Sequence, residues 1–304
     1  METKIKRIAV IGLGLIGGSL AMSLKLNGYQ VIGITKRANT LEIAKTAKVI
    51  DFGYLKLTSE ILNDVDIIFI ATPLSFIPGY IEEIGKIVKH DLILTDFGST
   101  KFEICKVAKR ALPENITFIG GHPMAGTEHA GFLSAQLGLF KKCAWLLTPV
   151  DENEQAKKSL TTLKKVINQI GAIPIIADPE KHDMAVALVS HLPLLASIGL
   201  CKLVKDLDDK ELQKLAMTIA SSGFRDTTRI GGCNPELSTD LMTSNLTQLS
   251  ELLPKYYKEL EAIVSLSKNQ NGKLIETLSN VSQWRSKVYD TEGKNYLLNK
   301  EPTV

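Results

Sequence analysis

The chain has 304 residues, 44% of them hydrophobic and 23% charged, with 36 Lys and Arg against 33 Asp and Glu. This length suits two domains of about 150 residues each, and the composition excludes a disordered or fibrous protein. A net charge of +3 is too small to indicate nucleic-acid binding, so we expect a small anionic substrate instead.

The four cysteines are widely spaced and form no CxxC pair or zinc-type cluster, which is typical of a protein in a reducing compartment. The N-terminal residues METKIKRIAVIG lead directly into a strand pattern without the apolar segment of a signal peptide. No uninterrupted apolar run approaches the roughly 20 residues that span a bilayer. We therefore expect a cytoplasmic protein with no membrane, nucleic-acid or metal partner.

Short apolar runs alternate with amphipathic stretches in the first part of the chain, which predicts a parallel sheet with helices on both faces. The expected strands are residues 7–12, 30–35, 66–72, 92–98, 117–121, 144–149 and 173–177. Asp178 and Pro179 then predict a helix start, and helical periodicity continues to about residue 290. The predicted class is α/β: a doubly wound, mostly parallel sheet over 1–177, an all-α helical domain over 178–293, and a tail over 294–304.

The segment GLGLIG matches GxGxxG between the first expected strand and a helix that ends near Asn27 and Gly28. In that position the glycines allow a tight turn, close approach of a pyrophosphate and close helix–strand packing. A glycine-rich turn without a ligand is the alternative, but the context favours a dinucleotide site. The predicted contact residues are Gly12, Leu13, Gly14, Leu15, Ile16 and Gly17. The loop at Thr72 and Pro73, after the third expected strand, should line the same groove.

The end of the second expected strand indicates which dinucleotide binds. NAD-binding proteins carry an acidic residue about 20 positions after the fingerprint, and none is present here. Instead the strand leads into Thr35, Lys36, Arg37 and Thr40, two hydroxyls and two cations suited to a 2′-phosphate. We expect NADP as the cofactor, with a solvated basic loop as the alternative.

Two polar residues follow strands at the edge where open α/β sheets bind ligands. Ser99 lies in TDFGSTK after the fourth expected strand, and His122 lies in GGHPMAGTEHAG after the fifth. A positioned imidazole can accept a proton from an alcohol near neutral pH, so His122 is the candidate base and Ser99 also borders the cofactor. The alternatives are a helix-capping role for Ser99 and a carbonyl hydrogen bond for His122.

The helical part holds a second group of candidates. His191 precedes Pro193, where the helix should break or kink. Arg225, Asp226 and Arg229 lie in SSGFRDTTR, which reads as a short segment between helices. Paired arginines suggest an anion site, and a surface ion-pair network with Asp226 is the alternative.

Five motifs together resemble the prephenate and arogenate dehydrogenases, and most closely the cyanobacterial arogenate dehydrogenases. They are GLGLIGGSL, TDFGSTK, GGHPMAGTEHAG, SHLP and SSGFRDTTRIGGCNPEL. The resemblance implies oxidative decarboxylation of an anionic cyclohexadienyl substrate, with hydride passing to NADP and a homodimer formed through the helical domain. It also implies that His122 accepts the proton of the 4-hydroxyl, with Ser99 beside it.

The resemblance assigns the substrate-binding positions as well: Thr127 and Glu128, His191 and Arg229, and Arg225 where relatives carry Lys or Arg. The chain departs from many prephenate enzymes at Leu194, which stands where they have a further histidine. The chain also leaves no room for an appended regulatory domain, so we expect any tyrosine feedback at the active site.

Arogenate dehydrogenase is the leading hypothesis and prephenate dehydrogenase the nearest alternative, because the two substrates differ only in the side chain. Glu128 and Asp226 are the candidate acceptors for the ammonium of arogenate. A sensor that binds a dinucleotide without chemistry is the alternative from another class, and it has no need of converging polar residues. A dehydrogenase of 3-hydroxy acids would use a lysine on the first interdomain helix, which here offers His182 and His191 instead.

Overall fold

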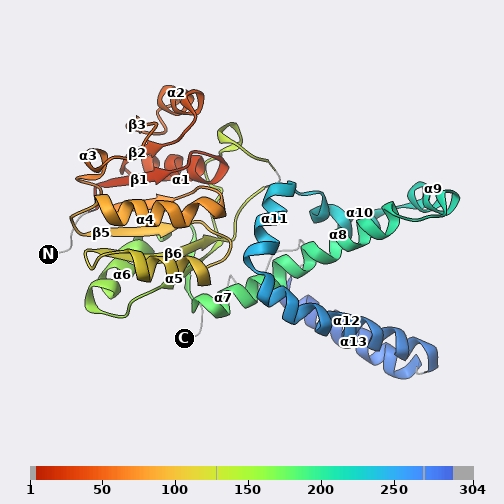
Figure 1. The fold of residues 1–304 in the computed structure, drawn as a ribbon. Helices are drawn as coiled ribbons and strands as arrows, with labels where there is room; N and C mark the ends of the chain where they lie inside the picture. Colours follow the sequence, from red (N-terminus) through yellow and green to blue (C-terminus); the bar gives the residue numbers. More distant parts are fainter. Residues whose placement is uncertain (1–4, 128, 270, 290–304) are drawn as a thin grey trace. The chain divides into compact units, whose positions relative to one another are not determined.

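The computed structural model describes residues 5–127, 129–269 and 271–289 (Figure 1). The chain forms two compact units, Met1–Asn245 and Leu246–Val304. The expected boundary at 177/178 separates sheet from helices in the sequence pattern, and its status as a domain boundary stays a prediction. Glu128, one of the predicted substrate-binding residues, lies outside the described residues, as does the tail over 294–304.

The described residues of the first unit form an eight-stranded sheet in the order β3-β2-β1-β4-β5-β6-β7-β8. The strands are β1 (Arg7–Ile11), β2 (Gln30–Ile34), β3 (Phe52–Tyr54), β4 (Ile67–Ile70), β5 (Leu92–Asp96), β6 (Ile116–Pro123), β7 (Ala144–Pro149) and β8 (Ile173–Ile176). Neighbouring strands are parallel except β6 and β7, which pair antiparallel. The prediction of a doubly wound, mostly parallel sheet is therefore confirmed.

All seven expected strands are present, and β3 is an addition. It spans three residues, pairs only with β2 at the edge of the sheet, and contains Gly53. Because it has neither a continuous apolar run nor a regular alternation, periodicity could not identify it.

Both faces of the sheet are buried. Ile8 and Val10 of β1 enter one apolar cluster, while Ala9 and Ile11 enter another. The first cluster includes residues of α1 (Leu15–Leu26) and α6 (Glu154–Gln169), and the second includes residues of α4 (Ile77–Ile87) and α5 (Phe102–Ala111). Side chains alternate between the faces of a strand, so strands covered on both sides must be apolar throughout. Each fully buried aliphatic side chain contributes about 1.5–3 kcal/mol.

The remaining helices of the sheet region are α2 (Ala38–Thr46) and α3 (Ser59–Leu62), with 3-10 turns at Leu74–Phe76 and Phe132–Ser134. After β8 the first unit continues with α7 (Pro179–Val186), a π-helical turn η3 (Ala187–His191), α8 (Leu192–Lys205), α9 (Lys210–Ile219), α10 (Ser222–Thr228), η4 (Arg229–Gly232) and α11 (Pro235–Ser244). The second unit contains α12 (Leu246–Asn269) and α13 (Asn271–Val288).

The predicted start of the helical part is confirmed. The Asp178 carboxylate caps α7 by accepting hydrogen bonds from the amides of Glu180 and Lys181, and Pro179 occupies the first turn. The π-helical turn lies directly before Pro193, which lacks an amide proton, so the expected helix irregularity is also present.

The expectation of a non-helical segment at residues 221–229 is wrong, because residues 222–228 form α10. Gly223 suggested a break, but it lies in the first turn of the helix, just after the extended residue Ser221. A glycine near a helix start does not end the helix.

Among the described residues, one helical stretch is long and apolar enough to cross a membrane by length and composition alone: Pro179–Lys205, of 27 residues. Core helices of soluble proteins meet the same criterion. The sequence pattern predicts no spanning segment, because His182, Asp183 and His191 interrupt the apolar run here. These three side chains are buried and hydrogen-bonded within the protein.

A buried ion pair ties the carboxyl ends of two central strands together. Asp96 ends β5, and its carboxylate accepts hydrogen bonds from the amides of Gly98 (2.7 Å) and Gly121 (3.0 Å). It also pairs with the ammonium of Lys101, and both side chains are fully buried. Asp96 therefore links the loop after β5 to β6.

Replacing Lys101 with Met should destabilise the fold by about 3–5 kcal/mol, because the Asp96 carboxylate would stay buried without its cation. Combining Lys101→Met with Asp96→Asn should recover part of that loss, since the buried charge is then gone. Urea unfolding of the single and double variants measures both values. Losses that simply add in the double variant would show that the two side chains are not coupled.

Candidate active site

The glycine-rich loop has the geometry of a dinucleotide site. Gly12 has a φ of +97°, and a Cβ there would lie 2.4 Å from the carbonyl oxygen of Ala71. A Cβ on Gly17 would lie 1.8 Å from the carbonyl oxygen of Gly12, whereas one on Gly14 would meet nothing within 4 Å. Gly12 and Gly17 thus shape the turn, and the space beside Gly14 stays open.

Near the glycine-rich loop, some polar groups have no partner among the described residues. Gly14 precedes α1 without a side-chain cap, so the first amides of the helix are free for an anion. The hydroxyl of Thr72 is buried without a hydrogen-bond partner among the described residues. These observations fit a pyrophosphate at the predicted residues 12–17. Thr72 and Pro73 follow β4, which lies beside β1 in the sheet.

A cavity of about 420 Å³ lies where β2 and β3 end. Its lining includes the predicted residues Thr35 and Lys36, and the Lys36 ammonium lies 5.4 Å from the ring centre of Phe76. Lys56 lines it too, and sequence reasoning missed this cation because it follows the unrecognised strand β3. Arg37 and Thr40 are not among the lining residues, which are Ile34, Thr35, Lys36, Leu55, Lys56, Leu57, Phe76, Gly79, Tyr80 and Glu83.

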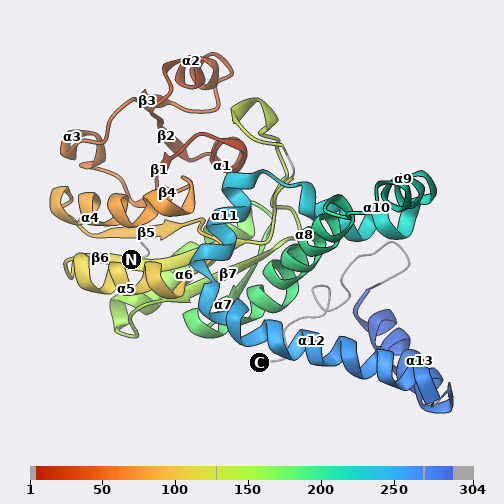
Figure 2. The ribbon, with the colours of Figure 1, turned by 45° about the vertical axis from the view of Figure 1, so that its right-hand side comes forward.

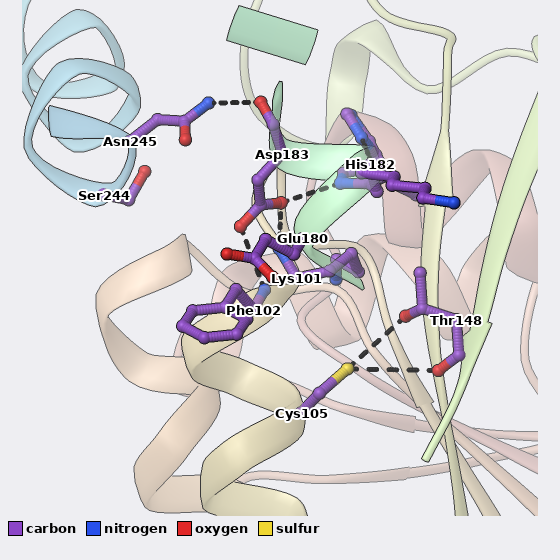
Figure 3. A network of polar contacts seen from close by, with 12 residues as sticks. Lys101, Phe102, Cys105, Thr148, Glu180, His182, Asp183, Ser244 and Asn245 are labelled. Carbon is purple, nitrogen blue, oxygen red and sulfur yellow. Dashed lines mark hydrogen bonds and ion pairs between the residues drawn. The ribbon is translucent and has the colours of Figure 1, made fainter. Parts of the chain in front are cut away.

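His122 lies at one end of a series of polar contacts that continues through His182 to Asp183. It lies near the end of β6, and its Nδ1 is 2.9 Å from Nε2 of His182 on α7. Nδ1 of His182 is 2.8 Å from Oδ1 of Asp183. The Asp183 carboxylate also accepts hydrogen bonds from the backbone amides of Lys101 (2.6 Å) and Phe102 (2.9 Å). Figure 3 shows Asp183 between His182 and the first turn of α5.

Ser99 lies in the loop between Asp96 and α5 and is half-buried. Among the described residues its hydroxyl has no hydrogen-bond partner, and it does not cap α5. The Asp183 carboxylate binds the amides at that helix start instead. Because Asp96 bonds to Gly121, the loop of Ser99 and the strand of His122 are held at the same edge of the sheet.

His122 and His191 are neutral at physiological pH. Burial lowers the pKa of His122 well below its usual 6.5, and the nearby His182, Lys101 and His191 lower it further. Burial lowers the pKa of His191 to about 4, a value that includes a smaller opposing effect of Asp183 and a lowering by His182. His122 is therefore in the form that can accept a proton.

His191 is held by Asn245. Nδ2 of Asn245 is 3.0 Å from Nδ1 of His191 and 2.8 Å from the carbonyl oxygen of Asp183. The two amide protons can satisfy both acceptors, which leaves the proton of the neutral His191 on Nε2. His191 can then donate a hydrogen bond through Nε2.

Among the described residues, Thr127, Arg225 and Arg229 form no hydrogen bond or ion pair with His122. Arg225 pairs with Asp226 at 2.8 Å, and both side chains are mostly exposed, so the ion-pair alternative describes Arg225 here. This contact lowers the pKa of Asp226 and raises that of Arg225. Arg229 is exposed in η4, and α10 and η4 pack on α8 (Figure 2). Thr127 is exposed, and its hydroxyl accepts from the amide of His129.

Two domains of the prephenate dehydrogenase family match this chain. The nucleotide-binding domain matches residues 20–176, and the dimerization domain matches residues 178–280. The chain belongs to the prephenate dehydrogenase family. It is thus an oxidoreductase of the prephenate, arogenate and cyclohexadienyl dehydrogenases.

Individual relatives differ in substrate. The chain is 31% identical to the prephenate dehydrogenase of Bacillus subtilis over 84% of this chain and 68% of that protein. It is 28% identical to the cyclohexadienyl dehydrogenase of Zymomonas mobilis over 89% of this chain and 91% of that protein. The crystal structure of Synechocystis arogenate dehydrogenase shares 35% identity and a TM-score of 0.82, covering 92% of this chain and 99% of that one.

A prephenate dehydrogenase from Aquifex aeolicus, crystallised with hydroxyphenyl propionate and NAD+, shares 25% identity. Its TM-score is 0.85, with 95% of this chain and all of that chain covered. The family identity is consistent with the geometry of residues 12–17, which fits a bound dinucleotide.

Sequence reasoning gave no task to three residues that contact the predicted histidines or each other, which are His182, Asp183 and Asn245. The first two adjoin each other in KHD at the start of α7, and a histidine next to an acid just after the sheet was the available signal. Asn245 gave no signal, because its partners are 54 and 62 positions away. Among the described residues no cluster of His, Cys, Asp and Glu could hold a metal ion.

Proposed function

We propose that this protein is an NADP-dependent arogenate dehydrogenase, which converts L-arogenate to L-tyrosine and carbon dioxide. The observation that carries the proposal is the neutral His122 at the carboxyl edge of the sheet, with its Nδ1 2.9 Å from Nε2 of His182. The likeness to Synechocystis arogenate dehydrogenase supports arogenate. The likeness to the Bacillus subtilis enzyme supports prephenate as the alternative.

In this proposal His122 Nε2 accepts the proton of the substrate's 4-hydroxyl, and Ser99 holds that hydroxyl. NADP+, when bound, supplies the acceptor for the hydride that leaves carbon 4. The carbon 1–carboxylate bond then breaks, its electron pair enters the ring, and His122 returns the proton to the oxygen as the phenol forms. The products balance as tyrosine, carbon dioxide and NADPH, and His122 ends neutral, as it began.

His191 has a separate task in the proposal. Asn245 keeps its Nδ1 occupied, so the Nε2 proton is available to an anionic group of the substrate. A neutral donor suits the ring carboxylate, because that group must lose its negative charge as carbon dioxide leaves, and a cation would hold it back. Thr127, Glu128, Arg225 and Arg229 remain candidate substrate contacts, in this chain or across a dimer.

The preference for NADP rests on the cavity at the end of β2. Lys36 and Lys56 bring two cations to it, and Thr35 a hydroxyl. Glu83 lines the same cavity and favours the unphosphorylated NAD. Since a 2′-phosphate would pair with two cations there, we propose that the lysines decide the preference.

We propose a homodimer formed through the helical part, which the dimerization-domain match supports. On α9, Leu212, Leu215 and Ile219 are 49%, 57% and 70% exposed and lie three and four positions apart on one face. Light scattering should give twice the 33.3 kDa mass of one chain, and Leu215→Arg should weaken the association. A monomer in the unchanged protein would contradict the proposal. The four free thiols support a cytoplasmic location.

Steady-state kinetics with L-arogenate and with prephenate, using purified protein and NADP+, tests the function. We expect arogenate to give the higher kcat/KM. In the same assay, His122→Asn should lower kcat by about 10²–10⁴ through loss of the base, with NADP+ affinity nearly unchanged.

Efficient turnover of prephenate alone would reverse the choice of substrate. Full activity of His122→Asn would remove His122 from the mechanism. Absence of turnover with both substrates would contradict the proposed function as a whole.

The cofactor proposal is tested by Lys36→Ala and Lys56→Ala. Each should lower kcat/KM for NADP+ by about tenfold, the value of one charge-assisted hydrogen bond, and leave kcat/KM for NAD+ nearly unchanged. Lys158→Ala, at an exposed lysine of α6, is the matched control for loss of one positive charge. Preference of the unchanged enzyme for NAD+, or equal losses with both cofactors, would contradict a 2′-phosphate site.

A further inference from the structure

We propose that His182 and Asp183 are positioning residues that act on His122 through two hydrogen bonds in series. They fix the tautomer of His122 whose Nε2 is unprotonated, and they stabilise the positive charge that His122 acquires with the substrate proton. This inference rests on the proposed function, since it concerns the proton of the same alcohol. It assigns a task to two buried residues outside the motifs that indicated the activity.

The direction of each hydrogen bond in the series follows from Asp183, its last member. The Asp183 carboxylate receives two backbone amides, from Lys101 and Phe102. Both amides can only donate, so the carboxylate acts as an acceptor and is best satisfied as the anion. The 2.8 Å contact with His182 Nδ1 is then a hydrogen bond donated by His182.

The same reasoning carries to His122. With its proton on Nδ1, a neutral His182 has a lone pair on Nε2, 2.9 Å from Nδ1 of His122. His122 therefore donates its Nδ1 proton to His182 and keeps the lone pair of its own Nε2 free. That is the tautomer required of a base that takes the substrate proton at Nε2.

The charges around the site explain why a positioning pair is needed. Burial disfavours the imidazolium of His122, a charged His182 would disfavour it as well, and the neighbouring Lys101 and His191 add to this effect. The ammonium of Lys101 is already paired with Asp96, so Asp96 offers little net negative charge. Among the described residues, the side chain that contacts the Asp183 carboxylate is that of His182, at 2.8 Å. Asp183 is thus the anion whose charge can act on His122, through His182.

Asp183 also has a structural task, which the test must separate. Its carboxylate caps α5, and its carbonyl oxygen accepts from Asn245, so replacing it would disturb both elements. Within the part of the chain that the structure describes, the ring nitrogens of His182 make two contacts, with His122 and with Asp183. Variants of His182 therefore test the proposal more cleanly than variants of Asp183.

The experiment compares His182→Leu and His182→Gln with the unchanged enzyme, using the substrate and NADP+. His182→Leu should lower kcat by about 10²–10³, the range expected for loss of a base's support, with KM changed by less than about threefold. His182→Gln should recover about tenfold of that loss, because its amide oxygen can accept the Nδ1 proton of His122.

The pH profile gives a readout that a purely structural role would not move. Loss of the stabilised imidazolium should shift the acid limb of kcat/KM to lower pH in His182→Leu, and less so in His182→Gln. If His182 instead acted as a cation repelling His122, its removal would shift the limb to higher pH. A shift upward, no shift, or unchanged kcat would each overturn the proposal.

A control variant separates folding from positioning. His90→Leu removes another histidine, whose Nε2 bonds the carbonyl oxygen of Val65 and which lies before β5 at the opposite edge of the sheet. It should alter thermal stability and leave kcat and the pH profile unchanged. Equal losses of kcat in His90→Leu and His182→Leu would assign the effect to folding and overturn the proposal. If the unchanged enzyme oxidises neither substrate, it is the proposed function that fails.

Discussion

The Asp183 carboxylate is the contact on which the site depends. It joins α7 to the first turn of α5, across a sequence separation of 82 residues for its contact with Lys101. One carboxylate oxygen of Asp183 also accepts a hydrogen bond from His182. The main-chain carbonyl oxygen of Asp183 accepts one from Asn245, and Asn245 also hydrogen-bonds to His191. A single residue thereby fixes the orientation of two histidines and the approach of the helical part to the edge of the sheet.

This arrangement places ionisable groups in a buried region without leaving a charge unmatched. Asp96 has Lys101, Asp183 has backbone amides and His182, and the pKa values of His122 and His191 are lowered so that both rings are neutral. Neutral imidazoles cost far less to bury than charged ones. The burial that keeps His122 neutral, and so able to accept a proton, also disfavours its imidazolium. The negative charge of Asp183, which acts through His182, therefore matters.

The fold was largely predictable from the sequence because fully covered strands must be apolar at every position, as Ile67–Ile70 is. The three-residue β3 and the helix α10 were not predicted. Short elements that contain glycine are stabilised by their neighbours more than by their own sequence pattern. The location of His122 and Ser99 at the carboxyl edge of the sheet was predictable because each follows a strand, and their roles stay predictions. For His182 and Asp183 the sequence offered only a weak signal, a histidine next to an acid, because adjacent polar residues on a helix usually face solvent. The contacts of Asn245 depend on the tertiary fold alone.

The most direct test of this account is the protonation state of His122 itself. Two-dimensional NMR of the protein labelled with nitrogen-15 at histidine distinguishes a protonated from an unprotonated ring nitrogen. We expect His122 at pH 7 to be neutral, with its proton on Nδ1 and a bare Nε2. A neutral ring protonated on Nε2, or an imidazolium, would contradict the central claim.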